Sequence, residues 1–205
     1  MSILLTGGAR SGKSHLAEKI ARRRQQKTGA GVIYIATAAA GDEEMEERIR
    51  AHKERRPEEW RTVEEELYPG RKLQEKFQEG EKRPEPGSVL LLDCITLLIS
   101  NHMVKAGGKE IGEAELVGEI ENELNIMFEL AEEYELEIIM VTNEVGMGVV
   151  PPSSMGRLFR DAAGRINRTL SQKCERTFLM VAGKPVDVDE LKADIFSGAG
   201  GEELI

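Results

Sequence analysis

The chain has 205 residues, enough for one domain with a substantial core. Its 28 Lys and Arg residues against 37 Asp and Glu residues give a formal net charge of −9. Non-specific binding to nucleic acids or acidic membranes needs a basic face, so this charge argues against both partners. The hydrophobic content of 40% is that of a globular protein, whereas 4% aromatic residues leave little for stacking on single-stranded bases.

The sequence predicts an intracellular, disulfide-poor protein. Cys94 and Cys174 lie far apart in apolar surroundings and outside any CxxC pair. We therefore expect reduced, buried thiols rather than a zinc site. The first residues carry no basic leader, and no run of about 18 apolar residues occurs. We expect a soluble cytoplasmic protein without a membrane segment.

Five short apolar runs recur along the chain. They are continuous rather than alternating, which is the pattern of strands buried on both faces. Longer segments with helical spacing lie between them, and strand followed by helix, repeated, predicts an α/β domain with a parallel sheet. The predicted strands span residues 3–5, 32–36, 89–92, 138–141 and 177–181, and the predicted helices residues 13–27, 42–56, 95–105, 113–134 and 155–173.

The domain organisation follows from where this alternation ends. No internal repeat or inter-domain linker interrupts it, so we expect one catalytic domain over residues 1–185. The pattern fades after residues 183–185, and the Gly-rich stretch 197–201 favours a C-terminal tail over residues 186–205. Residues 65–86 are rich in Glu, Lys and Arg, and we expect them to form solvated surface.

A glycine-rich motif follows the first predicted strand and opens the first predicted helix. It fits G-x-x-x-x-G-K-[ST] in the context that this phosphate loop requires. Its backbone N–H groups would face a phosphate chain, Lys13 would reach the β- and γ-phosphates, and Ser14 would ligate Mg²⁺. The alternative is an ordinary Gly-rich turn, which the full match disfavours. The predicted nucleotide-binding residues of this loop are Gly7, Gly8, Ala9, Arg10, Ser11, Gly12, Lys13 and Ser14.

An acidic residue stands where the partner of a phosphate loop is needed. Asp93 directly follows four apolar residues, at the end of a predicted strand. Beside a phosphate loop, an aspartate in this position holds Mg²⁺. The alternative is a helix N-cap for the segment that follows. Together with the loop, the pattern favours Asp93 as a metal ligand with Ser14.

His52 differs from the other histidines in its neighbours. Helical spacing aligns it with Met45 and Ile49, and several Arg and Lys residues surround it. Such cations hold phosphate oxygens, and a neutral imidazole among them is a competent nucleophile toward phosphorus. Spacing alone nevertheless favours a boundary histidine beside a core stripe. For His15 and His102 we expect packed or surface positions.

Six separated motifs extend from about residue 1 to residue 184. They are the phosphate loop, residues 34–38, the R-I-x-x-H-x-x-x-R-P-x-x-W-x-T-x-E run over 48–64, D-C-I-T at 93–96, V-T-N-E-V-G-M-G at 141–148, and F-R-D-x-x-G-R-x-N at 159–167. In this order they resemble the bifunctional adenosylcobinamide kinase and adenosylcobinamide-phosphate guanylyltransferase family of cobalamin biosynthesis. A set of six motifs is far more specific than a phosphate loop alone.

The resemblance implies two reactions. The aminopropanol hydroxyl of adenosylcobinamide would first be phosphorylated with ATP or GTP. GMP would then pass from GTP to that phosphate through a covalent guanylyl-histidine, giving adenosylcobinamide-GDP and pyrophosphate. The histidine of the family motif is His52 here. The resemblance thus implies GTP, ATP and Mg²⁺ as nucleotide and metal partners.

The resemblance also implies a fold, an assembly and further site residues. The fold would be a RecA-like P-loop NTPase domain with a mainly parallel central sheet flanked by helices, and the assembly a homotrimer. Residues 143–151, with Arg157, Arg160, Asp161, Arg165 and Asn167, would shape the corrinoid or phosphate site. The implied nucleotide-binding residues outside the loop are Ala36, Thr37, Ala38, Lys53, Glu54, Arg55, Arg56, Glu64 and Asp93.

Two rival functions make different predictions. A simple small-molecule kinase would keep the loop and Asp93, use His52 only structurally, and form no covalent nucleotide. A RecA-type ATPase acting on nucleic acid or protein would bind polynucleotides in a salt-dependent way. The charge of −9 and the lack of a basic stripe argue against the second rival.

Overall fold

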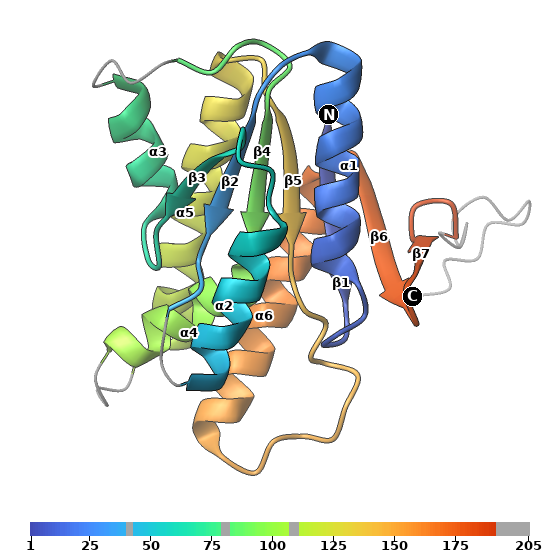
Figure 1. Ribbon diagram of the computed structural model, residues 1–205. Helices are drawn as coiled ribbons and strands as arrows, with labels where there is room; N and C mark the ends of the chain where they lie inside the picture. Colours follow the sequence, from blue (N-terminus) through green and yellow to red (C-terminus); the bar gives the residue numbers. More distant parts are fainter. Residues whose placement is uncertain (40–42, 79–82, 107–110, 192–205) are drawn as a thin grey trace, which may run out of the picture.

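A seven-stranded sheet forms the centre of the computed structural model, which describes residues 1–39, 43–78, 83–106 and 111–191 (Figure 1). The strand order is β3-β2-β4-β5-β1-β6-β7, with parallel pairing throughout except between β6 and β7. The predicted α/β class with a mainly parallel sheet is therefore confirmed. The strands are β1 (Ser2–Gly7), β2 (Val32–Ala36), β3 (Arg61–Glu64), β4 (Val89–Asp93), β5 (Glu137–Val141), β6 (Arg176–Val181) and β7 (Lys184–Asp187).

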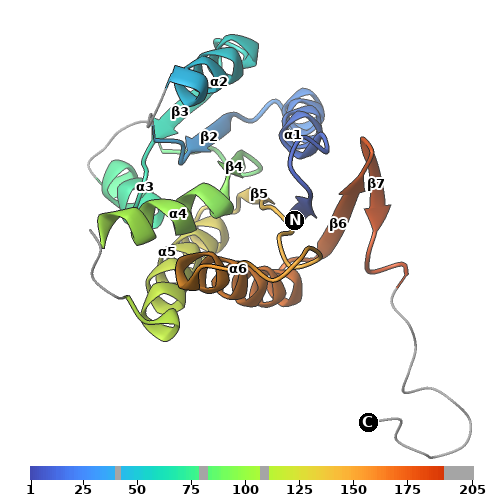
Figure 2. The ribbon, with the colours of Figure 1, turned by 90° about the horizontal axis from the view of Figure 1, so that it is seen from below.

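Helices cover both faces of the sheet. Figure 2 shows α1 and α2 on one face and α3, α4, α5 and α6 on the other. The helices are α1 (Lys13–Thr28), α2 (Glu43–Arg55), α3 (Pro69–Gln78), α4 (Ile95–Lys105), α5 (Glu113–Glu133) and α6 (Ser154–Lys173). Within the described residues no helix has the length and apolar character needed to cross a bilayer.

The continuous apolar runs are buried on both sides, as predicted. In β4, Leu90 and Leu92 point into the core under α3 to α6, whereas Val89 and Leu91 point into the smaller core under α1. Successive side chains of a strand face opposite ways, so a strand between two helical layers must be apolar at every position. The same division holds in β1, β2 and β5.

Two elements between β2 and β4 were not predicted. The expectation of solvated surface over residues 65–86 is wrong for α3, because Leu73 and Phe77 are fully buried in the core shared with α5. Only one apolar pair, four residues apart, marks this helix among charged residues, and such a narrow stripe is easily overlooked. The short strand β3 has a single buried apolar residue, Val63.

The C-terminal end of the described chain is a hairpin. β6 and β7 pair in antiparallel register through a two-residue turn, Ala182 and Gly183, whose φ angles are 49° and 79°. Positive φ at both positions suits the twist of a tight hairpin. β7 spans residues 184–187 and so crosses the predicted boundary between the domain, which was expected to end at residue 185, and the tail, which was expected to begin at residue 186. Of that predicted tail, residues 192–205 lie outside the described residues.

Gly70 and Gly118 offer a matched pair for testing the packing of α3 on α5. A Cβ at Gly70 would lie 2.4 Å from the carbonyl oxygen of Glu123, whereas a Cβ at Gly118, an exposed position on α5, would meet no heavy atom within 4 Å. We expect Gly70→Ala to lower the free energy of unfolding by about 1–3 kcal/mol through overpacking. Gly118→Ala should raise it by roughly 0.5–1 kcal/mol, since alanine favours the helix. Urea unfolding checks both, and equal effects would contradict this packing.

Candidate functional site

A cavity of about 520 Å³ lies at the carboxyl ends of the central strands. Its walls come from the loop between β1 and α1, the end of β4 and the last turns of α2. These segments meet at the lower end of the sheet in Figure 1. Ligands of open parallel sheets bind at this end, because the loops that leave the strands gather there.

Residues 7–14 close around the side-chain ammonium group of Lys13. Lys13 Nζ donates hydrogen bonds to the carbonyl oxygens of Gly7 and Gly8, at 2.9 and 2.7 Å. Gly7 has φ +143°, and a Cβ there would lie 2.6 Å from the carbonyl oxygen of Met180 on β6, so only glycine fits. Burial lowers the pKa of Lys13, an effect that the neighbouring Cys94 and Asp93 oppose. The loop thus holds a cation at its centre.

Asp93 connects three elements through its two carboxylate oxygens. Ser14 Oγ donates to Asp93 Oδ1 at 3.2 Å, and the Tyr34 hydroxyl donates to Oδ2 at 2.6 Å. His52 Nδ1 lies 3.9 Å from the same Oδ2. Burial and the Asp93 charge raise the pKa of Tyr34, so its hydroxyl remains a donor. The carboxylate is thereby oriented with one oxygen toward Ser14 and the other toward β2 and α2.

The end of α2 adds positive charge to the cavity. The Arg56 guanidinium lies 3.7 Å from the centre of the Tyr34 ring. Its Nε and Nη1 atoms are buried and have no hydrogen-bond partner among the described residues. Lys53 Nζ lies 2.5 Å from Glu64 Oε1 at the end of β3. Unsatisfied buried donors of a guanidinium are costly unless an anion completes them.

α1 supports the end of α2. Arg55 Nη2 lies 3.7 Å from Glu18 Oε1, and Arg22 donates to the carbonyl oxygen of Arg55 at 2.9 Å. Trp60, just after α2, donates from Nε1 to Gln25 at 2.9 Å. Burial raises the pKa of Glu18, and Arg55 lowers it in part. The helix that carries the phosphate loop therefore also supports the helix that carries His52.

Comparison with known proteins identifies the family. The model of the cobinamide kinase / cobinamide phosphate guanyltransferase family matches residues 3–188. The chain belongs to this family. Its fold is accordingly the P-loop NTPase fold.

Curated relatives agree with the family model. The chain is 39% identical to the bifunctional adenosylcobalamin biosynthesis protein CobP of Pseudomonas aeruginosa, over 91% of this chain and 96% of the relative. It is 36% and 38% identical to the bifunctional adenosylcobalamin biosynthesis proteins CobU of Salmonella typhimurium and Escherichia coli, each over 92% of this chain and 99% of the relative. The similarity thus extends well beyond the phosphate loop.

Most of the predicted site residues of this cobinamide kinase family member line one cavity. Four do not. Gly7 and Gly8 lie behind Lys13 as its carbonyl partners, Thr37 is fully buried, and Glu54 is exposed. The predicted residues that line the cavity are Ala9, Arg10, Ser11, Gly12, Lys13, Ser14, Ala36, Ala38, His52, Lys53, Arg55, Arg56, Glu64 and Asp93.

Several residues of the cavity wall were missed as site residues. Tyr34 had one signal in the sequence, since it is the only aromatic residue of an otherwise aliphatic predicted strand and faces the same way as Ala36. His15, expected to be packed or on the surface, is exposed and lines the cavity. The others carry no distinguishing pattern: Ile49, Cys94, Leu97 and Val141. Asn143, which also lines the cavity, belongs to the predicted site segment 143–151.

The side chains assigned to a corrinoid or phosphate site on α6 lie outside the cavity wall. Arg157 donates to the carbonyl oxygens of Pro151 and Pro152, and Arg165 pairs with Glu113 at 3.0 Å. Arg160 pairs with its neighbour Asp161 at 2.8 Å. Asn167 donates to the carbonyl oxygen of Asn143 at 3.0 Å. Through this contact α6 supports the loop after β5, of which Asn143 reaches the cavity.

The raised pKa of Glu18 predicts that the stability of the folded state depends on pH. The Glu18 carboxyl retains its proton more strongly in the folded state than in the unfolded chain, where its pKa has the ordinary value of 4.5. Stability is therefore lost as the pH rises from about 4.5 through the raised pKa. We expect Glu18→Gln to raise the unfolding midpoint relative to the unsubstituted protein more at pH 8 than at pH 4.5, as calorimetry can measure.

A matched substitution on the surface makes this test specific. Glu129 is exposed on α5, and Glu129→Gln should shift the midpoint equally at the two pH values. A Glu18→Gln difference that also stays constant with pH would contradict the effect of burial on the Glu18 carboxyl.

Proposed function

We propose that this protein is a bifunctional cobinamide kinase and cobinamide-phosphate guanylyltransferase. It phosphorylates the aminopropanol hydroxyl of adenosylcobinamide with ATP or GTP. It then transfers GMP from GTP through a guanylyl group on His52, giving adenosylcobinamide-GDP and pyrophosphate. The observation that carries the proposal is that His52 and the phosphate loop with Lys13 line the same cavity.

The kinase step uses the phosphate loop and the two oxygen ligands beside it. Lys13 and the loop amides hold the phosphates, and the α1 N-terminus favours their negative charge. Ser14 Oγ and Asp93 Oδ1, 3.2 Å apart, form an oxygen donor set of the kind that Mg²⁺ prefers, so these residues fit the ion. When bound there, Mg²⁺ would neutralise charge on the transferring phosphate.

The guanylyl step uses His52 as a nucleophile. An unprotonated imidazole nitrogen attacks the α-phosphorus of GTP, a phosphorus–nitrogen bond forms, and the bond to pyrophosphate breaks. An oxygen of cobinamide phosphate then attacks the same phosphorus and releases the histidine. Arg56, with two unsatisfied buried donors, stabilises the negative charge that develops on the phosphate oxygens. Lys53 lies beside His52 and adds positive charge at the same place.

The proposal includes the oligomeric state of the enzyme and its place in the cell. Resemblance to the family supports a homotrimer, and the exposed side chains of Met147, Val149 and Val150 offer local apolar contact area despite the net charge. Use of nucleoside triphosphates supports action in the cytoplasm, where these substrates are made.

Covalent labelling tests the proposed transfer. Incubation with α-labelled GTP and Mg²⁺, followed by denaturation, should leave acid-labile, alkali-stable label on the protein. His52→Ala should abolish the label, because the nucleophile is gone. His15→Ala should retain it, and this variant is the matched control because His15 also lines the cavity.

Each other outcome has a definite meaning. Label that persists in His52→Ala and disappears in His15→Ala would move the nucleophile to His15. A folded, GTP-binding protein that takes up no label would overturn the covalent mechanism and favour the simple kinase. Transfer of label from the protein to added cobinamide phosphate would complete the evidence for the second reaction.

The proposed Mg²⁺ ligand is testable through binding as well as turnover. Asp93→Asn removes one anionic oxygen while keeping the size of the side chain. We expect the Mg²⁺-dependent gain in nucleotide affinity to fall at least about tenfold, with nucleotide binding in EDTA little changed. Equilibrium binding of a fluorescent GTP analogue measures both. Asp189→Asn, beside β7, should leave the Mg²⁺ response unaltered, and an unaltered response in Asp93→Asn would contradict the assignment.

A further inference from the structure

The segment from residue 38 to residue 65 supplies most of the groups proposed for guanylyl transfer. It leaves the sheet after β2, carries His52, Lys53 and Arg56, and returns through β3 to Glu64. The kinase groups Lys13, Ser14 and Asp93 lie on α1 and β4 instead. The relative position of the two sets therefore depends on how the ends of the 38–65 segment are fixed.

One side chain of α4 contacts both ends of this segment. Asn101 Nδ2 donates to the carbonyl oxygen of Thr37 at 2.8 Å and to that of Glu66 at 2.9 Å. Carbonyl oxygens only accept hydrogen bonds, so the NH₂ group must face them and uses both of its protons. These two residues immediately flank the 38–65 segment. Asn101 thus joins the two points, Thr37 and Glu66, at which the segment leaves and re-enters the body of the protein; we call them the first and the second crossing.

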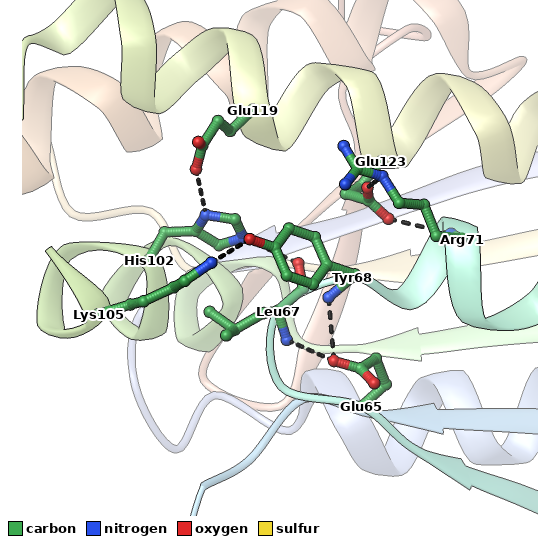
Figure 3. Close-up of polar contacts among 8 residues, drawn as sticks. All are labelled: Glu65, Leu67, Tyr68, Arg71, His102, Lys105, Glu119 and Glu123. Carbon is green, nitrogen blue, oxygen red and sulfur yellow. Dashed lines mark hydrogen bonds and ion pairs between the residues drawn. The ribbon is translucent and has the colours of Figure 1, made fainter.

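The next residue of α4 fixes the second crossing further (Figure 3). His102 is 2% exposed, and its Nε2 donates to the carbonyl oxygen of Leu67 at 2.8 Å. Its Nδ1 lies 2.7 Å from Glu119 Oε2 on α5, which holds the ring from the other side. The Glu65 carboxylate also accepts from the backbone N–H groups of Leu67 and Tyr68. The chain after Glu64 is therefore held from two directions.

The active-site end of α2 depends on these anchored ends. Lys53 pairs with Glu64, which lies two residues before Glu66, and His52 is the neighbour of Lys53. Thr37 lies between Ala36 and Ala38, which line the cavity. A displacement of either crossing thus moves His52 or Glu64 relative to the phosphate loop. Misplacement of reacting groups by about 1 Å can slow a reaction about a hundredfold.

We propose that Asn101 is a positioning residue for guanylyl transfer, and that His102 assists it through Leu67. The inference rests on the proposed function, since it concerns the attack of His52 on GTP. Asn101 acts by fixing the carbonyl oxygens of Thr37 and Glu66, and it is not among the residues that line the cavity. Its effect falls on the covalent step, while nucleotide binding by the phosphate loop is independent of it.

The test compares two identical substitutions. Asn101→Ala removes both hydrogen bonds, and Asn122→Ala, at an exposed position on α5, is the matched control. The rate of label uptake from saturating α-labelled GTP is measured in a single turnover, well below the unfolding midpoint of each variant. We expect Asn101→Ala to be slowed about ten- to a hundredfold, with unchanged affinity for a fluorescent GTP analogue. Asn122→Ala should match the unsubstituted protein in both.

If Asn101→Ala fails to fold, a second pair of variants tests whether the contacts from α4 position the 38–65 segment. In His102→Gln the amide nitrogen can replace Nε2 and still donate to Leu67, whereas in His102→Asn it replaces Nδ1 and loses that contact. We expect faster labelling in His102→Gln than in His102→Asn. A merely structural role of His102 would lower the unfolding midpoint without separating the labelling rates of the two variants at equal GTP affinity.

The outcomes separate this inference from the function on which it rests. An unlabelled unsubstituted protein would overturn the proposed function, and this inference with it. Two results would overturn the positioning role alone, provided that the unsubstituted protein is labelled. One is an Asn101→Ala labelling rate equal to that of the unsubstituted protein, and the other is an equal labelling rate in His102→Gln and His102→Asn. A fall in labelling that is matched by an equal fall in nucleotide affinity would also overturn it, because the defect would then lie in the phosphate loop.

Discussion

The carboxylate of Asp93 holds together the parts of this protein that meet at its cavity. Its side chain is 9% exposed, and a charge so far removed from water requires partners. Ser14 from α1, Tyr34 from β2 and His52 from α2 surround its two oxygens. One buried charge thus aligns the phosphate loop, the sheet and the helix that carries His52.

Local charge at the site contrasts with the charge of the whole chain. The protein carries a net charge of −9, yet Arg10, Lys13, Lys53, Arg55 and Arg56 all line the cavity. The electric field of the charges that line a cleft influences ligand binding more than the net charge of the whole protein does. An acidic protein can therefore bind a triphosphate at a cavity that is locally basic. Membership of the cobinamide kinase / cobinamide phosphate guanyltransferase family agrees with such a site.

The two helical layers have different relations to the cavity. α1 and α2 contribute to its wall, and polar contacts join α1 to the end of α2 and to Trp60 just after it: Glu18 with Arg55, and Gln25 with Trp60. α4 lies on the opposite face, over the large core, and reaches the same chain segments through Asn101 and His102. Polar contacts depend steeply on geometry, so they fix positions that apolar packing alone would leave less defined.

The amino-acid sequence predicts the alternation of strands and helices, the phosphate loop and the acidic residue that ends β4. These features are local, because continuous apolar runs are needed between two helical layers and the loop chemistry is contained in eight consecutive residues. It could not reveal α3, whose buried stripe is one apolar pair, or the contact of Tyr34 with Asp93 across 59 positions. The links from Asn101 to Thr37 and Glu66 join residues 64 and 35 positions apart. These contacts exist only in the folded protein, since an asparagine on a helix shows no pattern in the sequence before folding brings the two backbone segments beside it.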